Sequence, residues 1–237
     1  MIKLTLGSCP CCKRRTIFVA TNYWFRDYYR CLWCWSIPRQ RALMNVLKEK
    51  RPEYRKLKIH ECSPGRATRR QLTKECEDYT FSFFYDSNSL GKVMENGASN
   101  QNLEDMTFED NTFDIFITQD VMEHINNPQK AFSEIARVLK PGGLHIFTTP
   151  LYHFQKSRPR IEIQEGEIIN VLPAIYHGDP INADGCLVTY DWGYDIAEFI
   201  EQASGMKSEI IEFPKSKFTY RHGLDADFLE VIVSYKE

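Results

Sequence analysis

The sequence predicts an α/β fold with a mainly parallel sheet, preceded by a small cysteine-rich module. From residue 57 onward, short apolar segments alternate with segments whose apolar residues recur at helical spacing. Such alternation implies a parallel sheet with right-handed crossovers. Five of the eight cysteines fall within the first 34 residues. At 237 residues, 43% of them hydrophobic, the chain is long enough for one such core and a small additional module.

The cysteine spacing predicts a zinc ribbon over residues 1–37. Two Cys-x-x-Cys pairs are separated by 18 residues, and thiolates at this spacing bind Zn²⁺ in a closed tetrahedral site. A site with four sulfur ligands leaves no position for water, so the zinc is expected to be structural. The predicted ligands are Cys9, Cys12, Cys31 and Cys34. Cys11 is an alternative to Cys9 or Cys12, and the competing interpretation is four buried thiols without a metal.

Three regions are expected after these cysteines. Residues 38–56 are expected to form a linker helix, with the helix itself ended by Pro52. Residues 57–237 are expected to form the main domain, with an unusually long insertion at 151–192. The expected strands are 57–61, 79–85, 113–118 and 144–148, with a closing pair at 206–213 and 228–235. The expected helices of the main domain are 69–75, 128–139 and 195–203.

Charge is unevenly distributed along the chain. Residues 1–70 contain 17 Lys and Arg against four Asp and Glu, whereas the remainder contains 13 against 28. A basic N-terminal region favours either a nucleic-acid partner or docking of the basic module on the acidic body. The sequence leaves both interpretations open. Because no apolar run approaches the roughly 18 residues that span a bilayer, we expect a cytoplasmic protein with no membrane partner.

Four consecutive segments carry a resemblance to a known family. They are residues 102–108, 111–114, 119–124 and 134–143, the last reading Glu-Ile-Ala-Arg-Val-Leu-Lys-Pro-Gly-Gly. In type and order these segments closely resemble the central motifs of class I S-adenosylmethionine-dependent methyltransferases. The resemblance implies a Rossmann-like seven-stranded sheet with a final antiparallel strand, and S-adenosylmethionine as the methyl donor.

The same resemblance implies a set of cofactor-binding residues. The glycine loop of the family corresponds to residues 61–67, where only the middle glycine, Gly65, is kept and small residues stand at Ser63 and Ala67. We expect Gly65 to supply positive φ and close backbone approach. Glu61 is expected near the methionine amino group, Asp86 near the ribose and Gln119 beneath the methionine. The expected cofactor-binding residues are Glu61, Ser63, Gly65, Asp86, Asn102, Leu103 and Gln119.

The insertion supplies the candidates for a catalytic base. His177 is the preferred base and His153 the second candidate, since both follow the fifth strand of the predicted sheet. A surface histidine in a turn is the alternative interpretation of His177. His124 is expected to have a structural role at a helix start. The insertion also holds aromatic residues that suit a planar acceptor or a packed cap, among them Tyr152, Tyr176, Tyr190 and Trp192.

Three functions remain open. The leading hypothesis is methyl transfer to a small molecule, a saccharide or a biosynthetic intermediate. The alternative is a tRNA or rRNA methyltransferase in which the basic N-terminal region grips phosphates. The third is a non-catalytic binding protein that kept the fold and lost the cofactor, a hypothesis that Ser63 and Ala67 in the glycine loop motivate.

Overall fold

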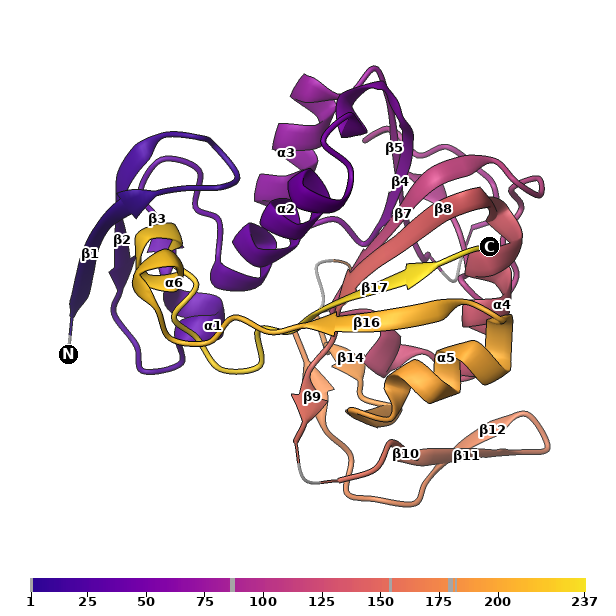
Figure 1. Ribbon diagram of the computed structural model, residues 1–237. Coiled ribbons are helices and arrows are strands. Elements are labelled where there is room, and N and C mark those ends of the chain that lie inside the picture. Colours follow the sequence, from indigo (N-terminus) through magenta and orange to yellow (C-terminus); the bar gives the residue numbers. More distant parts are fainter. Residues whose placement is uncertain (1, 86–87, 154, 179–180, 182) are drawn as a thin grey trace.

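A computed structural model describes residues 2–85, 88–153, 155–178, 181 and 183–237. The chain forms an α/β body with a small N-terminal β module on one side (Figure 1). No helix in the described part of the chain is long and apolar enough to cross a bilayer.

The body is built on one seven-stranded sheet with the order β16-β17-β8-β7-β4-β5-β6. The five strands from β8 to β6 are parallel, and β17 runs antiparallel to both β8 and β16. This arrangement confirms the expected sheet and its antiparallel closing strand. The strands are β4 Lys58–Cys62, β5 Asp78–Phe83, β6 Ser99–Asn100, β7 Phe113–Gln119, β8 Leu139–Thr148, β16 Lys207–Ile211 and β17 Val231–Tyr235.

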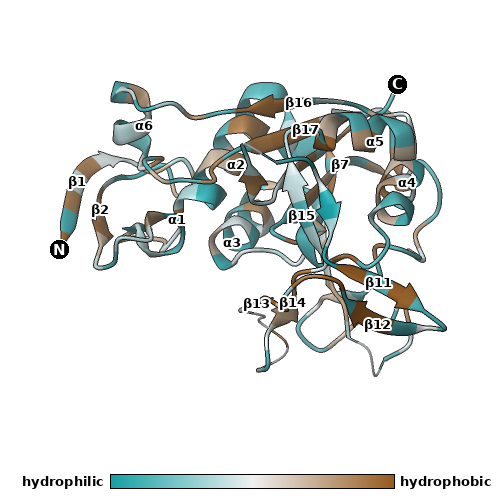
Figure 2. Cartoon of the chain, turned by 90° about the horizontal axis from the view of Figure 1, so that it is seen from below, coloured by the Kyte–Doolittle hydropathy of each residue, from teal (hydrophilic) through white to brown (hydrophobic). Residues whose placement is uncertain are grey.

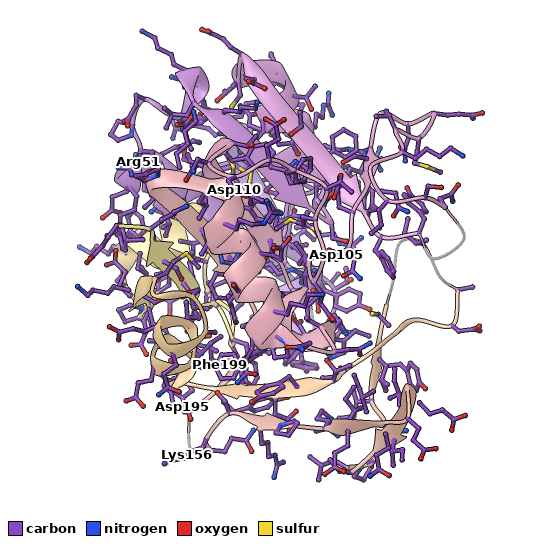
Figure 3. The ribbon with its side chains drawn as sticks, turned by 90° about the vertical axis from the view of Figure 1, so that its right-hand side faces the viewer. Arg51, Asp105, Asp110, Lys156, Asp195 and Phe199 are labelled. Atoms are coloured by element: carbon purple, nitrogen blue, oxygen red, sulfur yellow. The ribbon has the colours of Figure 1, made fainter. Side chains whose placement is uncertain are left out.

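Helices cover both faces of this sheet, because its central strand is apolar on both sides. Ile115 and Ile117 of β7 pack into one core with α2 (Pro38–Lys50) and α3 (Arg66–Glu75). Phe116 packs into the other core with α4 (Pro128–Val138) and α5 (Ile196–Ser204). Figure 3 shows α4 and α5 side by side, with Phe199 of α5 contacting α4.

The N-terminal module is a three-stranded antiparallel sheet. Its elements are β1 Lys3–Ser8, β2 Arg15–Ala20, α1 Phe25–Tyr28 and β3 Arg30–Cys31. β1 precedes the first cysteine pair, whereas β2 lies between the two pairs and β3 ends at Cys31. The short helix α6 (Lys217–His222), which lies between β16 and β17 in sequence, packs on β1 (Figure 1). The N-terminal module is therefore completed by α6, a segment from the C-terminal part of the sequence.

The insertion after β8 is folded into short strands. They are β9 Leu151–Tyr152, β10 Arg158–Pro159, β11 Ile161–Gln164, β12 Glu167–Asn170, β13 Tyr176–His177, β14 Cys186–Leu187 and β15 Tyr190–Gly193. The hairpins β11–β12 and β13–β14 lie together below the body (Figure 2). A buried ion pair, in which Nη1 of Arg160 donates to both carboxylate oxygens of Asp191, holds the base of the insertion.

Arg41 of α2 joins the module to the body. Its side chain is completely buried, and its guanidinium donates hydrogen bonds to the carbonyl oxygens of Tyr29 (2.8 Å), Gly223 (2.6 Å) and Ser36. It also stacks over the ring of Phe18 at 4.6 Å. The guanidinium of Arg41 thus donates hydrogen bonds to buried carbonyl oxygens of two segments that are far apart in sequence, the cysteine module and the residue after α6.

We expect Arg41→Met to destabilise the protein by about 3 kcal/mol or more, because three buried carbonyl oxygens lose their donor at once. Urea denaturation followed by tryptophan fluorescence measures the change. Arg70→Met, at an exposed position of α3, is the matched control and is expected to stay within about 0.5 kcal/mol of the wild type. Equal midpoints for the two variants would contradict this role for Arg41.

Candidate active site

A cleft of about 800 Å³ opens at the carboxyl ends of β4 and β7. This is the sheet edge at which α/β proteins of this type bind ligands. The cleft lining includes Trp24 and Arg26 at α1, Arg39 and Gln40 of α2, the loop Ser63–Arg66, Gln119 and Asp120 at the end of β7, Tyr152, Tyr176 and His177 of the insertion, and Phe228. A larger groove of about 1040 Å³ lies on the N-terminal module, away from this edge.

The glycine loop differs from expectation in where its positive φ occurs. Ser63 has φ +52°, a left-handed conformation that favours glycine, whereas Gly65 has φ −68°. The expectation of positive φ at Gly65 is therefore wrong. What Gly65 provides is space, because a Cβ there would collide with the side-chain amide of Gln40 and lie 3.3 Å from Gln119 Oε1.

Glu61 lies beneath this loop and is completely buried. Its carboxylate accepts hydrogen bonds from the hydroxyls of Thr68 (2.9 Å) and Tyr79 (2.6 Å) and from the amide of Gln119. Burial raises the pKa of Glu61 to about 7, although these three donors act to lower it. The carboxylate is thus used within the protein, and Glu61 is not among the residues that line the cleft.

The floor of the cleft presents donors and one acceptor. Helix α3 begins just after Gly65, with no side chain capping its first turn, and both Gly65 and Arg66 line the cleft. The free N–H groups of a helix N-terminus attract anions. Beside them, Gln119 Oε1 is buried and accepts no hydrogen bond from any described residue. The same small area therefore suits a carboxylate and an ammonium group together.

Two further cofactor candidates, Asn102 and Leu103, lie outside the cleft lining. Asn102 Oδ1 accepts a hydrogen bond from the backbone N–H of Glu104 at 2.9 Å, in the loop after β6. Leu103 is buried in the core cluster that contains Cys62. Asp86 lies outside the described residues. The assignments of these three residues to adenine and ribose stay predictions.

Arg26 of the N-terminal module forms an ion pair with Asp120 within the cleft. Its guanidinium donates to both carboxylate oxygens, one at 2.8 Å, and also to the carbonyl of Phe228 at 2.9 Å. Asp120 has φ +53° and accepts a further hydrogen bond from Thr148. Burial alone would raise the pKa of Asp120, but Arg26 and Arg39 hold it below its usual range. Motif reasoning missed Arg26, because nothing in the cysteine pattern indicates which residue faces the body.

Two histidines and a glutamate meet at the far end of the cleft. His124 Nε2 and His177 Nδ1 each lie 3.9 Å from Glu123 Oε1, and the two imidazole rings meet edge to face at 5.1 Å. The desolvation of Glu123, together with the charge of Asp120, raises its pKa to about 8. His153, the second predicted base, lies instead beside Tyr194 and Glu230.

The four predicted cysteine ligands lie together in the N-terminal module. Their sulfur atoms are all within 4.8 Å of one another, with Cys9 and Cys34 at 3.6 Å and Cys12 and Cys31 at 3.9 Å. Cys11 is buried but outside this group. No disulfide joins cysteines in the described chain.

The known proteins to which this chain is similar are methyltransferases. Residues 67–147 match the family described as "Methyltransferase domain". The chain is 33% identical over 101 residues to a sarcosine/dimethylglycine N-methyltransferase of Aphanothece halophytica, covering 42% of this chain. It is 40% identical over 48 residues to a glycine/sarcosine/dimethylglycine N-methyltransferase of Actinopolyspora halophila, covering 20% of this chain. The matches span only 34% and 8% of the lengths of these two relatives.

Solved structures share the fold at low sequence identity. An S-adenosylmethionine-dependent methyltransferase of Mesorhizobium loti has a TM-score of 0.53 at 14% identity, over 82% of this chain and 98% of that one. The YcgJ protein of Bacillus subtilis has a TM-score of 0.52 at 13% identity, over 83% and 98%. The chain therefore shares the Rossmann-like fold of these S-adenosylmethionine-dependent methyltransferases, and its residues 67–147 are similar to a methyltransferase domain.

Proposed function

We propose that this protein transfers a methyl group from S-adenosylmethionine to a small-molecule acceptor. The observation that carries the proposal is the cleft itself, in which groups suited to an amino-acid zwitterion adjoin an aromatic, partly basic cavity. The family match over residues 67–147 supports the same reaction class.

The methionine end of the donor fits the residues at the cleft floor. The N-terminus of α3 and the side chain of Arg66 would bind its carboxylate. Gln119 Oε1, buried and without a described donor, would accept a hydrogen bond from its ammonium group. When bound, S-adenosylmethionine supplies an electrophilic methyl group on a sulfonium. The work of the protein is then to position the acceptor and to remove its proton.

His177 is better suited than His153 to act as the base. His177 lines the cleft and is half-buried, whereas His153 lies outside it. Burial and the neighbouring His124 lower the pKa of His177, which keeps the imidazole neutral and able to accept a proton near neutral pH.

The acceptor is best sought among small molecules. Trp24, Tyr28, Tyr152, Tyr176 and Phe228 line the cleft and suit a planar or apolar acceptor. The N-terminal module forms one wall of the cleft, which limits the room for a macromolecular substrate. Saccharides and biosynthetic intermediates, as well as amines like those in the names of the matched relatives, are the classes to test first.

The basic N-terminal region is used in part for docking within the chain. Ion pairs join Lys3 to Asp225, Lys13 to Glu75 and Lys50 to Glu209, in addition to the pair of Arg26 with Asp120. These contacts favour intramolecular docking over nucleic-acid binding as the reason for the charge asymmetry.

We also propose that the four clustered cysteines hold one structural Zn²⁺. Tetrahedral sulfur coordination fits their mutual distances. Ser36 Oγ lies 3.3 Å from Cys9 Sγ, and Thr16 Oγ1 lies 3.5 Å from Cys31 Sγ. These hydroxyls would support the thiolates by donating weak hydrogen bonds.

Calorimetric titration of the full chain with S-adenosylmethionine tests the function. We expect saturable binding well below roughly 1 mM. Gly65→Arg should abolish it, because a long cationic side chain would fill the cleft floor. Thr73→Arg adds the same group at an exposed position of α3 and should leave binding unchanged. No heat at millimolar donor would favour the non-catalytic binder, and methyl transfer to a panel of small acceptors would follow a positive result.

Zinc content tests the metal proposal. We expect about one zinc per chain in the purified protein. Cys34→Ser should lose most of it and lower the thermal midpoint, because a structural zinc contributes directly to folding. Cys11→Ser changes a neighbouring buried thiol and should keep the metal. The ligand assignment fails if elemental analysis finds the two variants equally depleted.

A further inference from the structure

Glu123, His124 and His177 form a second cluster of metal-binding side chains, separate from the cysteines. One ligand atom of each lies within 4.8 Å of the others. Glu123 and His124 belong to the turn after β7, whereas His177 comes from β13, more than fifty residues later. The cluster combines a carboxylate and two imidazoles at the end of the cleft where the acceptor would bind.

Hydrogen bonds fix which atoms of this cluster face one another. His124 Nδ1 lies 2.8 Å from the carbonyl oxygen of Leu187, and an imidazole nitrogen facing a carbonyl must carry the proton. The lone pair of His124 is therefore on Nε2, which points towards Glu123 Oε1. The other carboxylate oxygen, Oε2, accepts a hydrogen bond from Thr149 at 3.0 Å. Backbone and hydroxyl contacts that orient ligands in this way are typical of metal sites.

The free carboxylate oxygen has no donor. Glu123 is only 2% exposed, and its Oε1 accepts no hydrogen bond from the described residues. The charge of Arg26 offsets the burial of Glu123 only in part, and among the described residues both Arg26 and Arg39 form their ion pairs with Asp120. A buried oxygen without a hydrogen-bond donor is costly. A bound cation would remove that cost.

We propose that Glu123, His124 and His177 bind a divalent first-row transition metal ion. One carboxylate and two imidazoles are a donor set that such ions favour, with remaining positions open to water or another ligand. Two donors bound to one zinc at about 2.1 Å lie about 3.4 Å apart in tetrahedral geometry. The 3.9 Å separations here need only a small closure to reach this value.

Metal binding would link the insertion to the sheet edge. His177 would become a ligand and would then not serve as the proposed base. The open coordination positions would face the cleft, where an acceptor oxygen or nitrogen could occupy one of them. The site is independent of the methyl donor, so its existence is tested without requiring methyl transfer.

The experiment adds Co²⁺ to the full chain carrying one zinc, with that zinc content verified beforehand, and follows binding by calorimetry, with zinc and cobalt both quantified after dialysis. We expect one further equivalent of cobalt while the zinc content stays constant. His177→Gln removes a ligand on a half-exposed hairpin, where misfolding is not expected, and should weaken cobalt binding by about 100-fold or more, beyond the loss typical of supporting residues. Glu123→Gln should act in the same direction.

His153→Gln is the matched control, because it removes a histidine of the same insertion that lies outside the cluster. It should leave cobalt binding unchanged. The proposal is overturned if cobalt merely replaces the zinc, if no additional cobalt binds, or if His177→Gln binds cobalt as tightly as the wild type. Titration with S-adenosylmethionine is measured separately, so failure of the metal site and failure of the proposed methyl transfer remain distinguishable.

Discussion

The buried guanidinium of Arg41 is the interaction on which the arrangement of the whole chain depends. A cation completely removed from water is unfavourable unless its donors are satisfied, and here carbonyls of Tyr29, Ser36 and Gly223 satisfy them. These carbonyls come from the cysteine module and from the segment after α6. The cost of burying the charge is offset only when all these segments dock together, so Arg41 couples the folding of the module to that of the body. Four thiolates holding zinc would carry excess negative charge close to Arg41, which would favour the same position.

Docking of the module has a direct consequence for the cleft. Once α1 is held against α2, Arg26 reaches Asp120 at the carboxyl end of β7. The module then supplies one wall of a site whose floor and opposite wall come from the body. A structural metal in the cysteine cluster would thereby affect the site through Arg26. Loosening of the cluster would displace Arg26 and leave the buried Asp120 without a compensating charge.

The periodicity of apolar residues and the order of the motifs are enough to predict the sheet and helices of the body. They do not predict the long-range contacts that complete the site. The continuous apolar run Ile115-Phe116-Ile117 indicates the central strand because both of its faces are buried. The neighbouring sequence does not distinguish Arg26 from the other arginines of the basic N-terminal region, because its role depends on a contact with Asp120, 94 residues away in sequence. The positive φ of Ser63 is equally invisible, because a serine gives no sign of the left-handed conformation that a glycine would suggest.

The sequence predicts a structural role for His124 at a helix start, but the structure gives this residue a different position. It ends a 3₁₀ turn, Met122–His124, rather than starting a helix, and that turn is joined to the insertion by several bonds. The backbone N–H of Thr189 donates to the carbonyl of Glu123 at 2.8 Å, and the indole of Trp192 donates to that of Met122 at 3.1 Å. These hydrogen bonds therefore fix the base of the insertion to the turn after β7. Because these bonds hold the base of the insertion, the position of His177 over Glu123 follows from the backbone, so a proton or metal bound there would meet a preorganised group of side chains.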